Sequence, residues 1–158
     1  MLIVYLFLSF ILACLIVTFV GERSKISGPS MSPYLKHNAH IIIDKLSYRF
    51  RSPKRFEVIA ILFKKTKRSY YLKRIIAMPG ETIQIKKGYI YINDQKLDEN
   101  YGNGEIKRPG LAKKKIQLQA EEYFVLGDNR DDSLDSRDVK VGVVSKKDII
   151  GRAWMKIK

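Results

Sequence analysis

Three short segments of the sequence carry residue types that could perform or support acyl-transfer chemistry. Residues 27–33 read Ser-Gly-Pro-Ser-Met-Ser-Pro, residues 73–80 read Lys-Arg-Ile-Ile-Ala-Met-Pro-Gly, and residues 127–137 read Gly-Asp-Asn-Arg-Asp-Asp-Ser-Leu-Asp-Ser-Arg. A serine hydroxyl is a weak nucleophile until a neighbouring base removes its proton. The chemistry therefore depends on which base the fold can bring to a serine such as Ser30.

Histidine is the usual base for a serine nucleophile, but the sequence does not favour it here. His37 and His40 follow Ser30 within ten residues, and no acidic residue is placed to orient either ring, so a histidine-based triad is not supported. No third ligand lies near the two histidines, so a zinc site is not expected either. Both are interpreted as exposed loop or strand-end residues.

Lysine is the alternative base, provided that its amine is desolvated. A free lysine has a pKa of about 10.4, whereas a working base needs a pKa of about 7–8. Lys73 suits this requirement because it lies in an apolar, strand-like run. Alternation along a strand places Tyr71, Lys73 and Ile75 on one face and Arg74 on the other. Taken singly, Lys73 is typical of a surface lysine and Ser30 of a turn, so only the joint pattern predicts chemistry.

The elements that must position these residues are mostly strands. Runs rich in β-branched and aromatic residues recur through the body, with tight turns predicted at Lys87-Gly88 and Asn93-Asp94. A glycine-rich loop covers 101–110, and Ser145 could cap one short helix over 145–150. The predicted fold is mainly β, an antiparallel sheet or barrel-like catalytic domain. The strands are expected at 39–44, 57–63, 70–77, 82–86, 89–92, 95–97, 116–118, 123–126, 141–144 and 153–157.

The N-terminal segment is unlike the rest of the chain. Leu2–Val20 contains no charged side chain, and nineteen helical residues span about 28 Å at roughly 1.5 Å each, close to the hydrocarbon thickness of a bilayer. A cleaved secretory signal would need a basic start and a small-x-small site, and neither is present. A weak lipoprotein-like box ends at Cys14, but apolar residues continue beyond it. The sequence predicts one retained transmembrane helix within domain 1–21, followed by a body at 22–158.

The body is strongly basic. All 30 Lys and Arg and all 16 Asp and Glu lie beyond residue 20, so the net charge of +14 belongs to the body. The basic runs fall in predicted turns and loops, at 64–68, 86–87, 113–115 and 146–147. A nucleic-acid patch and attraction to an anionic membrane are two interpretations, and a solvated rim is favoured over both. The single cysteine lies in the apolar segment, so no internal disulfide forms in the body.

Charge counting does not settle which side of the membrane holds the body. Arg23 and Lys25 flank the apolar segment on the body side, which by the positive-inside rule would place the body in the cytoplasm. That rule weakens for long domains. The tail before the apolar segment is also too short to carry basic residues that could be compared with Arg23 and Lys25.

In this order behind an apolar segment, the three segments resemble the type I signal peptidases of the S26 family, serine proteases that cut signal peptides from exported proteins. The resemblance covers nearly the whole chain, and its most specific part is the pattern G-D-N-R-x-x-S-x-D-S-R at 127–137. The small body and single apolar segment resemble the Gram-positive bacterial type. The resemblance implies a body outside the cytoplasm, no metal or cofactor, and exported preproteins and the lipid bilayer as partners, with no nucleic acid.

The resemblance also implies a role for each matching residue. Ser30, immediately before Met31, matches the family nucleophile, and Lys73 matches the general base. The Ser30 N–H is expected to donate to the oxyanion, whereas the serine hydroxyl that some members place two residues earlier is replaced by Gly28. The supporting residues are Ser133, matching the hydroxyl that orients the lysine amine, Asp135 and Arg137, matching a structural ion pair, and Asp128.

The sequence departs from the family pattern in three turns. Tyr34 stands where threonine is usual, and Phe56-Glu57 and Ala39-His40 stand where Gly-Asp is common. These changes bear on substrate preference more than on the reacting groups. Two alternatives stay open: a related Ser/Lys processing peptidase with a narrow substrate, of the pilus or conjugation type, and a non-catalytic, membrane-anchored basic module that binds an anionic polymer.

Overall fold

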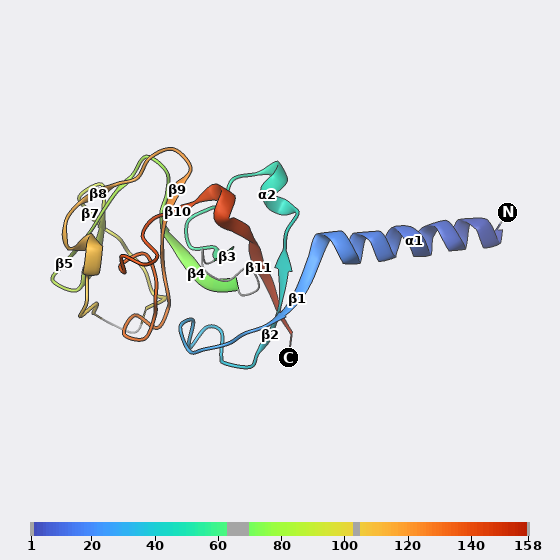
Figure 1. The fold of residues 1–158 in the computed structure, drawn as a ribbon, viewed down its shortest axis with the longest axis horizontal. Coiled ribbons are helices and arrows are strands. Elements are labelled where there is room, and N and C mark those ends of the chain that lie inside the picture. Colours follow the sequence, from blue (N-terminus) through green and yellow to red (C-terminus); the bar gives the residue numbers. More distant parts are fainter. Residues whose placement is uncertain (1, 63–69, 103–104, 158) are drawn as a thin grey trace.

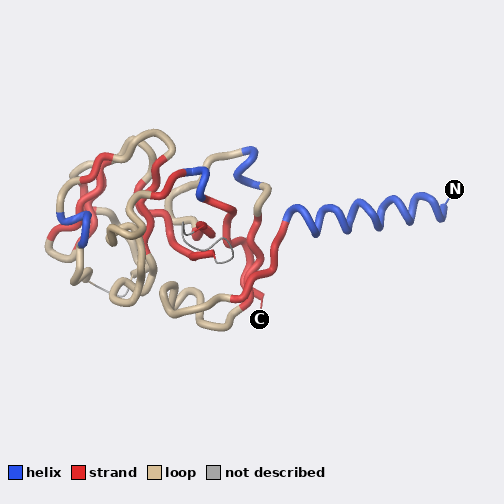
Figure 2. Tube along the Cα trace, viewed as in Figure 1, coloured by secondary structure: helices blue, strands red, loops and turns tan. Residues whose placement is uncertain are grey.

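A computed structural model of the chain describes residues 2–62, 70–102 and 105–157. The helix α1 (Leu2–Val20) projects from a body built of β-strands, as Figures 1 and 2 show. Within the described residues, the strands form one seven-stranded sheet in the order β1-β2-β11-β3-β4-β9-β10 and one four-stranded sheet in the order β7-β6-β5-β8. The pairings between neighbouring strands are antiparallel, so the mainly β, antiparallel fold predicted from the sequence is confirmed.

The larger sheet carries the residues of interest, and the smaller sheet lies at the end of the body away from α1 (Figure 1). The larger sheet comprises β1 (Gly21–Lys25), β2 (His40–Asp44), β3 (Val58–Leu62), β4 (Tyr70–Ala77), β9 (Glu122–Leu126), β10 (Val144–Ser145) and β11 (Ile149–Ile157). The smaller sheet comprises β5 (Thr82–Lys86), β6 (Tyr89–Ile92), β7 (Gln95–Lys96) and β8 (Ile116–Gln117). Three short helical turns complete the described elements: α2 (Ser47–Phe50), η1 (Gly110–Lys113) and η2 (Lys146–Asp148).

Strand β4 is the central strand of the site, paired with β3 on one side and β9 on the other. Its alternation follows the prediction: Tyr71 and Ile75 belong to one hydrophobic cluster, and the Lys73 amine lies 5.7 Å from the centre of the Tyr71 ring. Arg74 belongs to the other face, where its guanidinium meets Asp128. Because both faces of β4 are covered, a lysine in its middle must be buried.

The predicted hairpins are present in the smaller sheet. Lys87 and Gly88, with φ of 48° and 79°, join β5 to β6, and Asn93 and Asp94, with φ of 49° and 66°, join β6 to β7. Two successive residues of positive φ make the turn that matches the twist of antiparallel strands.

Several boundaries differ from the sequence predictions. Strand β1, with the polar sequence Gly-Glu-Arg-Ser-Lys, was not predicted and forms an edge of the larger sheet beside β2. The strand predicted at 141–144 is mostly turn, because the Val141 and Gly142 N–H groups donate to the Asp138 carbonyl. The helix predicted at 145–150 is only η2, Ser145 makes no side-chain cap, and β11 begins at Ile149. The basic run at 64–68 lies outside the described residues.

The N-terminal helix has its predicted extent, Leu2–Val20. None of the helices in the described residues qualifies by length and apolar character as a membrane span. The transmembrane anchor at 1–21 therefore stays a prediction.

Candidate active site

The structure brings Ser30 and Lys73 together although 43 residues separate them in sequence. The Lys73 amine lies 2.9 Å from the Ser30 hydroxyl oxygen, within hydrogen-bond distance. Ser30 occupies a turn between β1 and β2 that is seated on the core by Met31 and Leu35, which are 1% and 3% exposed. Lys73 is presented by the middle of β4. A turn between two strands of the larger sheet and a third strand of that sheet thus hold the serine hydroxyl and the lysine amine in contact.

Burial controls the electrostatics of Lys73. The side chain is 1% exposed, and within the described residues its amine makes no ion pair closer than 4.0 Å. Desolvation lowers the pKa of Lys73 from 10.5 to about 8, with Asp135 and Asp128 opposing the fall and Arg137 adding to it. About a tenth of the amine is therefore neutral at pH 7, far more than for an exposed lysine, and only a neutral amine can accept the serine proton.

A cleft opens beside the Ser30 hydroxyl. Its volume is about 390 Å³, and it lies between the segment that follows α1 and the first residues of β4. Its lining comprises Glu22, Ser24, Lys25, Ile26, Ser27, Ser30, Met31, Tyr70, Tyr71 and Leu72.

Asp128 forms a buried ion pair with Arg74, the neighbour of Lys73. Arg74 Nε and Nη2 donate to the two carboxylate oxygens at 2.8 and 2.6 Å, and both side chains are at most 5% exposed. The guanidinium also lies 3.9 Å from the centre of the Tyr101 ring and 4.9 Å from that of Tyr34. This pair fixes the start of the 127–137 segment against β4.

Asp135 and Arg137 form a second buried pair in the same segment. Arg137 Nε and Nη2 donate to the Asp135 carboxylate at 2.8 and 2.9 Å. Asp135 Oδ2 also accepts the Gly127 N–H at 3.0 Å, so the segment is folded back on itself. The negative charge of Asp135 is neutralised by Arg137 rather than by the lysine amine, so Lys73 has no direct counter-ion among the residues that the structure describes.

Ser133 lies close to Ser30 and Lys73, but it does not make the hydrogen bond to the lysine amine that its predicted role requires. Its hydroxyl is buried and has no hydrogen-bond partner within the described residues, so it does not bond Lys73 Nζ here. Gly127 separates it from Ser30: a methyl group on Gly127 would collide with the Ser133 side chain and with the Ser30 carbonyl oxygen. That Ser133 orients the lysine amine stays a prediction.

Gly28 adopts a backbone conformation that suits glycine. Its φ is +91°, a region that residues with a Cβ rarely enter. Its N–H donates to His37 Nδ1 at 3.0 Å, which gives His37 a part in holding the loop. The position offers no side-chain donor, and that the Ser30 N–H donates to an oxyanion stays a prediction.

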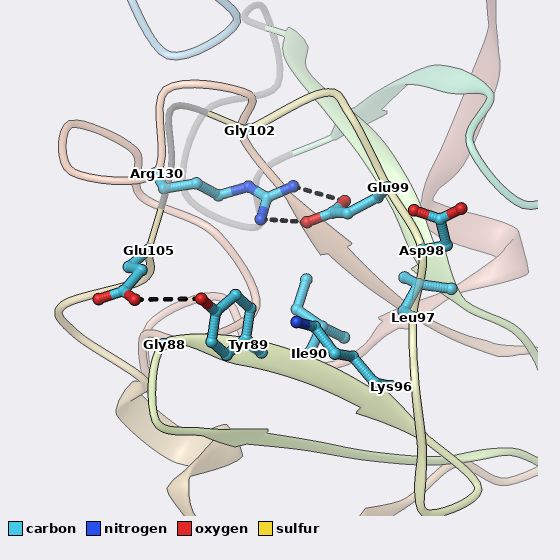
Figure 3. A pocket seen from close by; sticks show the side chains of 10 residues that line it. All are labelled: Gly88, Tyr89, Ile90, Lys96, Leu97, Asp98, Glu99, Gly102, Glu105 and Arg130. Atoms are coloured by element: carbon cyan, nitrogen blue, oxygen red, sulfur yellow. Dashed lines mark hydrogen bonds and ion pairs between the residues drawn. The ribbon is translucent and has the colours of Figure 1, made fainter.

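Two neighbours in the 127–137 segment have contacts that the sequence reasoning missed. Asn129 bonds the turn that carries Ser30. Arg130, 2% exposed, donates to the Gly127 carbonyl at 3.1 Å and to Glu99 at 2.5 and 2.7 Å. Figure 3 shows the Arg130–Glu99 pair at one side of a hollow of about 430 Å³. The matching motif contained both residues, but their partners are distant in sequence.

Acidic and histidine side chains do not gather into a metal site within the described residues. No group of three or more His, Cys, Asp or Glu is arranged to hold an ion there.

Comparison with known proteins assigns the chain to a family. The model of the family described as "Signal peptidase, peptidase S26" matches residues 1–157. A "Probable signal peptidase I-2" of Synechocystis sp. is 37% identical over 92% of this chain and 67% of its own. "Signal peptidase I U" of Bacillus subtilis is 39% identical over 80% of this chain and 70% of its own.

A solved structure agrees with these matches. The crystal structure of a signal peptidase I from Enterococcus faecalis has a TM-score of 0.53 and is 30% identical, covering 65% of this chain and 97% of that chain. The relatives include cyanobacterial as well as Bacillus proteins, so the likeness is not restricted to the Gram-positive type. The chain belongs to the signal peptidases of peptidase family S26, serine endopeptidases.

Proposed function

We propose that this chain cleaves signal peptides from exported preproteins with Ser30 as nucleophile and Lys73 as general base. The observation that carries the proposal is the 2.9 Å contact between the Ser30 hydroxyl and an amine that is buried and without an ion pair among the described residues. A hydroxyl in contact with a base of lowered pKa is the arrangement that activates a serine. The names of the relatives supply the substrate class.

The reaction proceeds as two acyl transfers. Ser30 Oγ attacks the scissile carbonyl carbon while its proton passes to Lys73 Nζ. The negative oxygen that forms accepts a hydrogen bond from the Ser30 N–H. The Lys73 ammonium then protonates the leaving nitrogen, which frees the mature protein and leaves an ester on Ser30. Lys73 next takes a proton from water, and the hydroxide attacks the ester carbon. As the ester bond breaks, the Lys73 ammonium returns that proton to Ser30 Oγ, and the signal peptide leaves as a carboxylic acid that ionises in water.

The experiment that tests this function is cleavage of purified preproteins by the full chain in detergent. The variants are Ser30→Ala and Lys73→Arg, with the exposed Lys114→Arg as a matched control. Arginine keeps the positive charge but does not release its proton in a protein, so Lys73→Arg is expected to lose at least a thousandfold in kcat while Lys114→Arg keeps wild-type activity. Product masses identify the bond.

The outcomes separate the candidate functions. One cut in each of several preproteins, absent in both active-site variants, supports general signal peptide processing. Cleavage of a single preprotein among many indicates a narrow processing peptidase. No cleavage by folded wild type, or full cleavage by Ser30→Ala, contradicts the proposal.

We also propose that α1 holds the body at a membrane, with the body on the extracytoplasmic side. Support comes from nineteen consecutive residues without a charged side chain and from apolar side chains such as Leu2, Ile3 and Phe10, which are at least 67% exposed. Exposed apolar surface on this scale is costly in water. Retention of the full chain in the membrane pellet after alkaline extraction is expected, and its release into the supernatant would contradict the anchor.

A further inference from the structure

We propose that Asn129 is a positioning residue that aims the Ser30 N–H at the negative oxygen of the tetrahedral intermediate. The inference rests on the proposed attack by Ser30 and adds a residue to which that mechanism gave no role. Asn129 is not expected to touch the substrate or to exchange a proton.

Asn129 bonds the backbone on both sides of the nucleophile. Its N–H donates to the Ser30 carbonyl oxygen at 3.0 Å, and its side-chain Nδ2 donates to the Pro29 carbonyl oxygen at 3.4 Å. These two carbonyls belong to the peptide groups that precede and follow the Ser30 Cα atom. One residue therefore clamps both peptide planes that meet at the nucleophile.

The geometry of the peptide group converts this clamp into a constraint on the oxyanion donor. A trans peptide group is planar, so the Pro29 carbonyl and the Ser30 N–H lie in one plane and point in opposite directions. Holding the Pro29 oxygen on one side therefore aims the Ser30 N–H to the other. The Ser32 N–H donates to the same Pro29 oxygen at 2.9 Å, so Asn129 shares this task with the turn itself.

The Ser30 N–H is free for this use. Within the described residues it donates no hydrogen bond, and Ser30 lines the cleft, so this N–H is available to an acceptor that enters the cleft. The oxygen of a tetrahedral intermediate on Ser30 is such an acceptor. Because Gly28 supplies no side-chain donor, the aim of this one N–H has a larger effect on the rate than it would in a site with two donors.

Asn129 can act as a clamp because its own neighbours are fixed. Asp128 is held by the buried pair with Arg74. Arg130 is held by Glu99 and by the Gly127 carbonyl, at 2.5 and 3.1 Å, and Figure 3 shows that its side chain extends toward Glu99. The segment on each side of Asn129 is thus tied to a different part of the body, so its contact with Pro29 is made by a rigid support.

The experiment compares Asn129→Ala and Asn129→Asp with wild type in preprotein cleavage. Alanine keeps the backbone bond to Ser30 but loses the Nδ2 donor, and aspartate keeps the shape but cannot donate when ionised. Removing a whole oxyanion donor costs about 100- to 1000-fold in kcat, so misaiming one is expected to cost Asn129→Ala about tenfold. KM is expected to stay within about twofold. Asn100→Asp, at an exposed position, is the control for added charge.

A peptide aldehyde provides a readout that a merely structural role would not change. The aldehyde forms a hemiacetal with the Ser30 hydroxyl, whose oxygen imitates the negative oxygen of the intermediate. Its inhibition constant is expected to rise in Asn129→Ala by about the factor by which kcat falls. The reason is that the hydrogen bond from the Ser30 N–H stabilises the transition state and its mimic but not the bound substrate. The midpoint of the pH profile is expected to be unchanged, since Lys73 is untouched.

The controls keep this inference separate from the function on which it rests. Cleavage by wild type and its loss in Ser30→Ala test the function alone. Unchanged kcat, a loss confined to KM, or unchanged aldehyde affinity in Asn129→Ala would each overturn the role of Asn129 even in an active enzyme. If Asn129→Ala melts early, the shape-matched Asn129→Asp decides: wild-type kcat and aldehyde affinity in that variant would also overturn the role.

Discussion

Replacing Lys73 by methionine is expected to abolish cleavage and yet stabilise the folded chain near neutral pH. The amine is buried without an ion pair among the described residues, and burial lowers the pKa of Lys73 from 10.5 to about 8. That fall means that the folded state disfavours the protonated amine. Methionine has a similar length, fits irregular core sites and carries no charge, so Lys73→Met removes the penalty.

The pKa values give the size and the pH range of the effect. A fall from 10.5 to about 8, at about 1.36 kcal/mol per pKa unit, corresponds to about 3 kcal/mol. Between these two pH values the unfolded chain binds more protons than the folded one, so the free energy of unfolding of wild type rises with pH. The penalty is therefore complete below about pH 8 and gone above about pH 10.5.

Thermal melts of the full chain in detergent measure the effect. In a chain of this length about 1 kcal/mol corresponds to roughly 2–4 °C, so Lys73→Met is expected to melt about 6–12 °C above wild type at pH 7 and near wild type at pH 10.5. Lys114→Met, at an exposed position, should match wild type at both values. The reasoning would be refuted if Lys73→Met melted no higher than wild type at pH 7. It would also be refuted if the variant melted higher than wild type by the same amount at pH 7 and at pH 10.5.

Two further substitutions probe the 127–137 segment. In Gly127→Ala the new methyl group meets the Ser133 side chain and the Ser30 carbonyl oxygen, so the turn must shift. We expect the free energy of unfolding to fall by about 1–3 kcal/mol and kcat to fall at least tenfold. Wild-type values of both quantities would contradict the close packing. Asp128→Ala leaves the Arg74 guanidinium buried and unpaired; denaturant unfolding should show a loss of about 3–5 kcal/mol, whereas a loss below 1 kcal/mol would mean that the pair adds little.

The predicted features of the site depended on local sequence signals. Tyr71 and Ile75 showed the alternation that placed Lys73 inward, and the structure has that alternation. The turns at 87–88 and 93–94 could also be predicted from the sequence, because glycine, asparagine and aspartate tolerate positive φ. Such signals lie within a few residues of one another, so they need no knowledge of the rest of the fold.

The features that were missed depend on contacts between distant segments. Strand β1 has a polar sequence, and it is a strand only because the edge of β2 pairs with it. Asn129 acquires its role from carbonyl groups about 100 residues away. Arg130 likewise finds Glu99 in the loop beyond β7. Neither residue has a neighbouring pattern that indicates its partner, so their functions become visible only when the chain is folded.

Phe56 shows a departure from the family pattern that the fold accommodates. Glycine is common at this turn, and Phe56 adopts the left-handed conformation, with φ of 68°, that glycine adopts at less cost. Its ring lies 5.2 Å from that of Tyr101, and its carbonyl accepts a hydrogen bond from Arg74 at 2.8 Å. Ring packing thus offsets some of the backbone strain, a compensation that no sequence pattern reveals.

The pH dependence of kcat/KM for preprotein cleavage tests the Ser30–Lys73 account most directly. This quantity reports the essential groups of the free enzyme, and only the neutral amine can take the serine proton. We expect kcat/KM to rise with pH around a midpoint of about 8, the pKa to which burial lowers Lys73, and Lys73→Met to show no turnover at any pH. A rate that is flat from pH 6 to 10, or turnover that persists in Lys73→Met, would contradict Lys73 as the base.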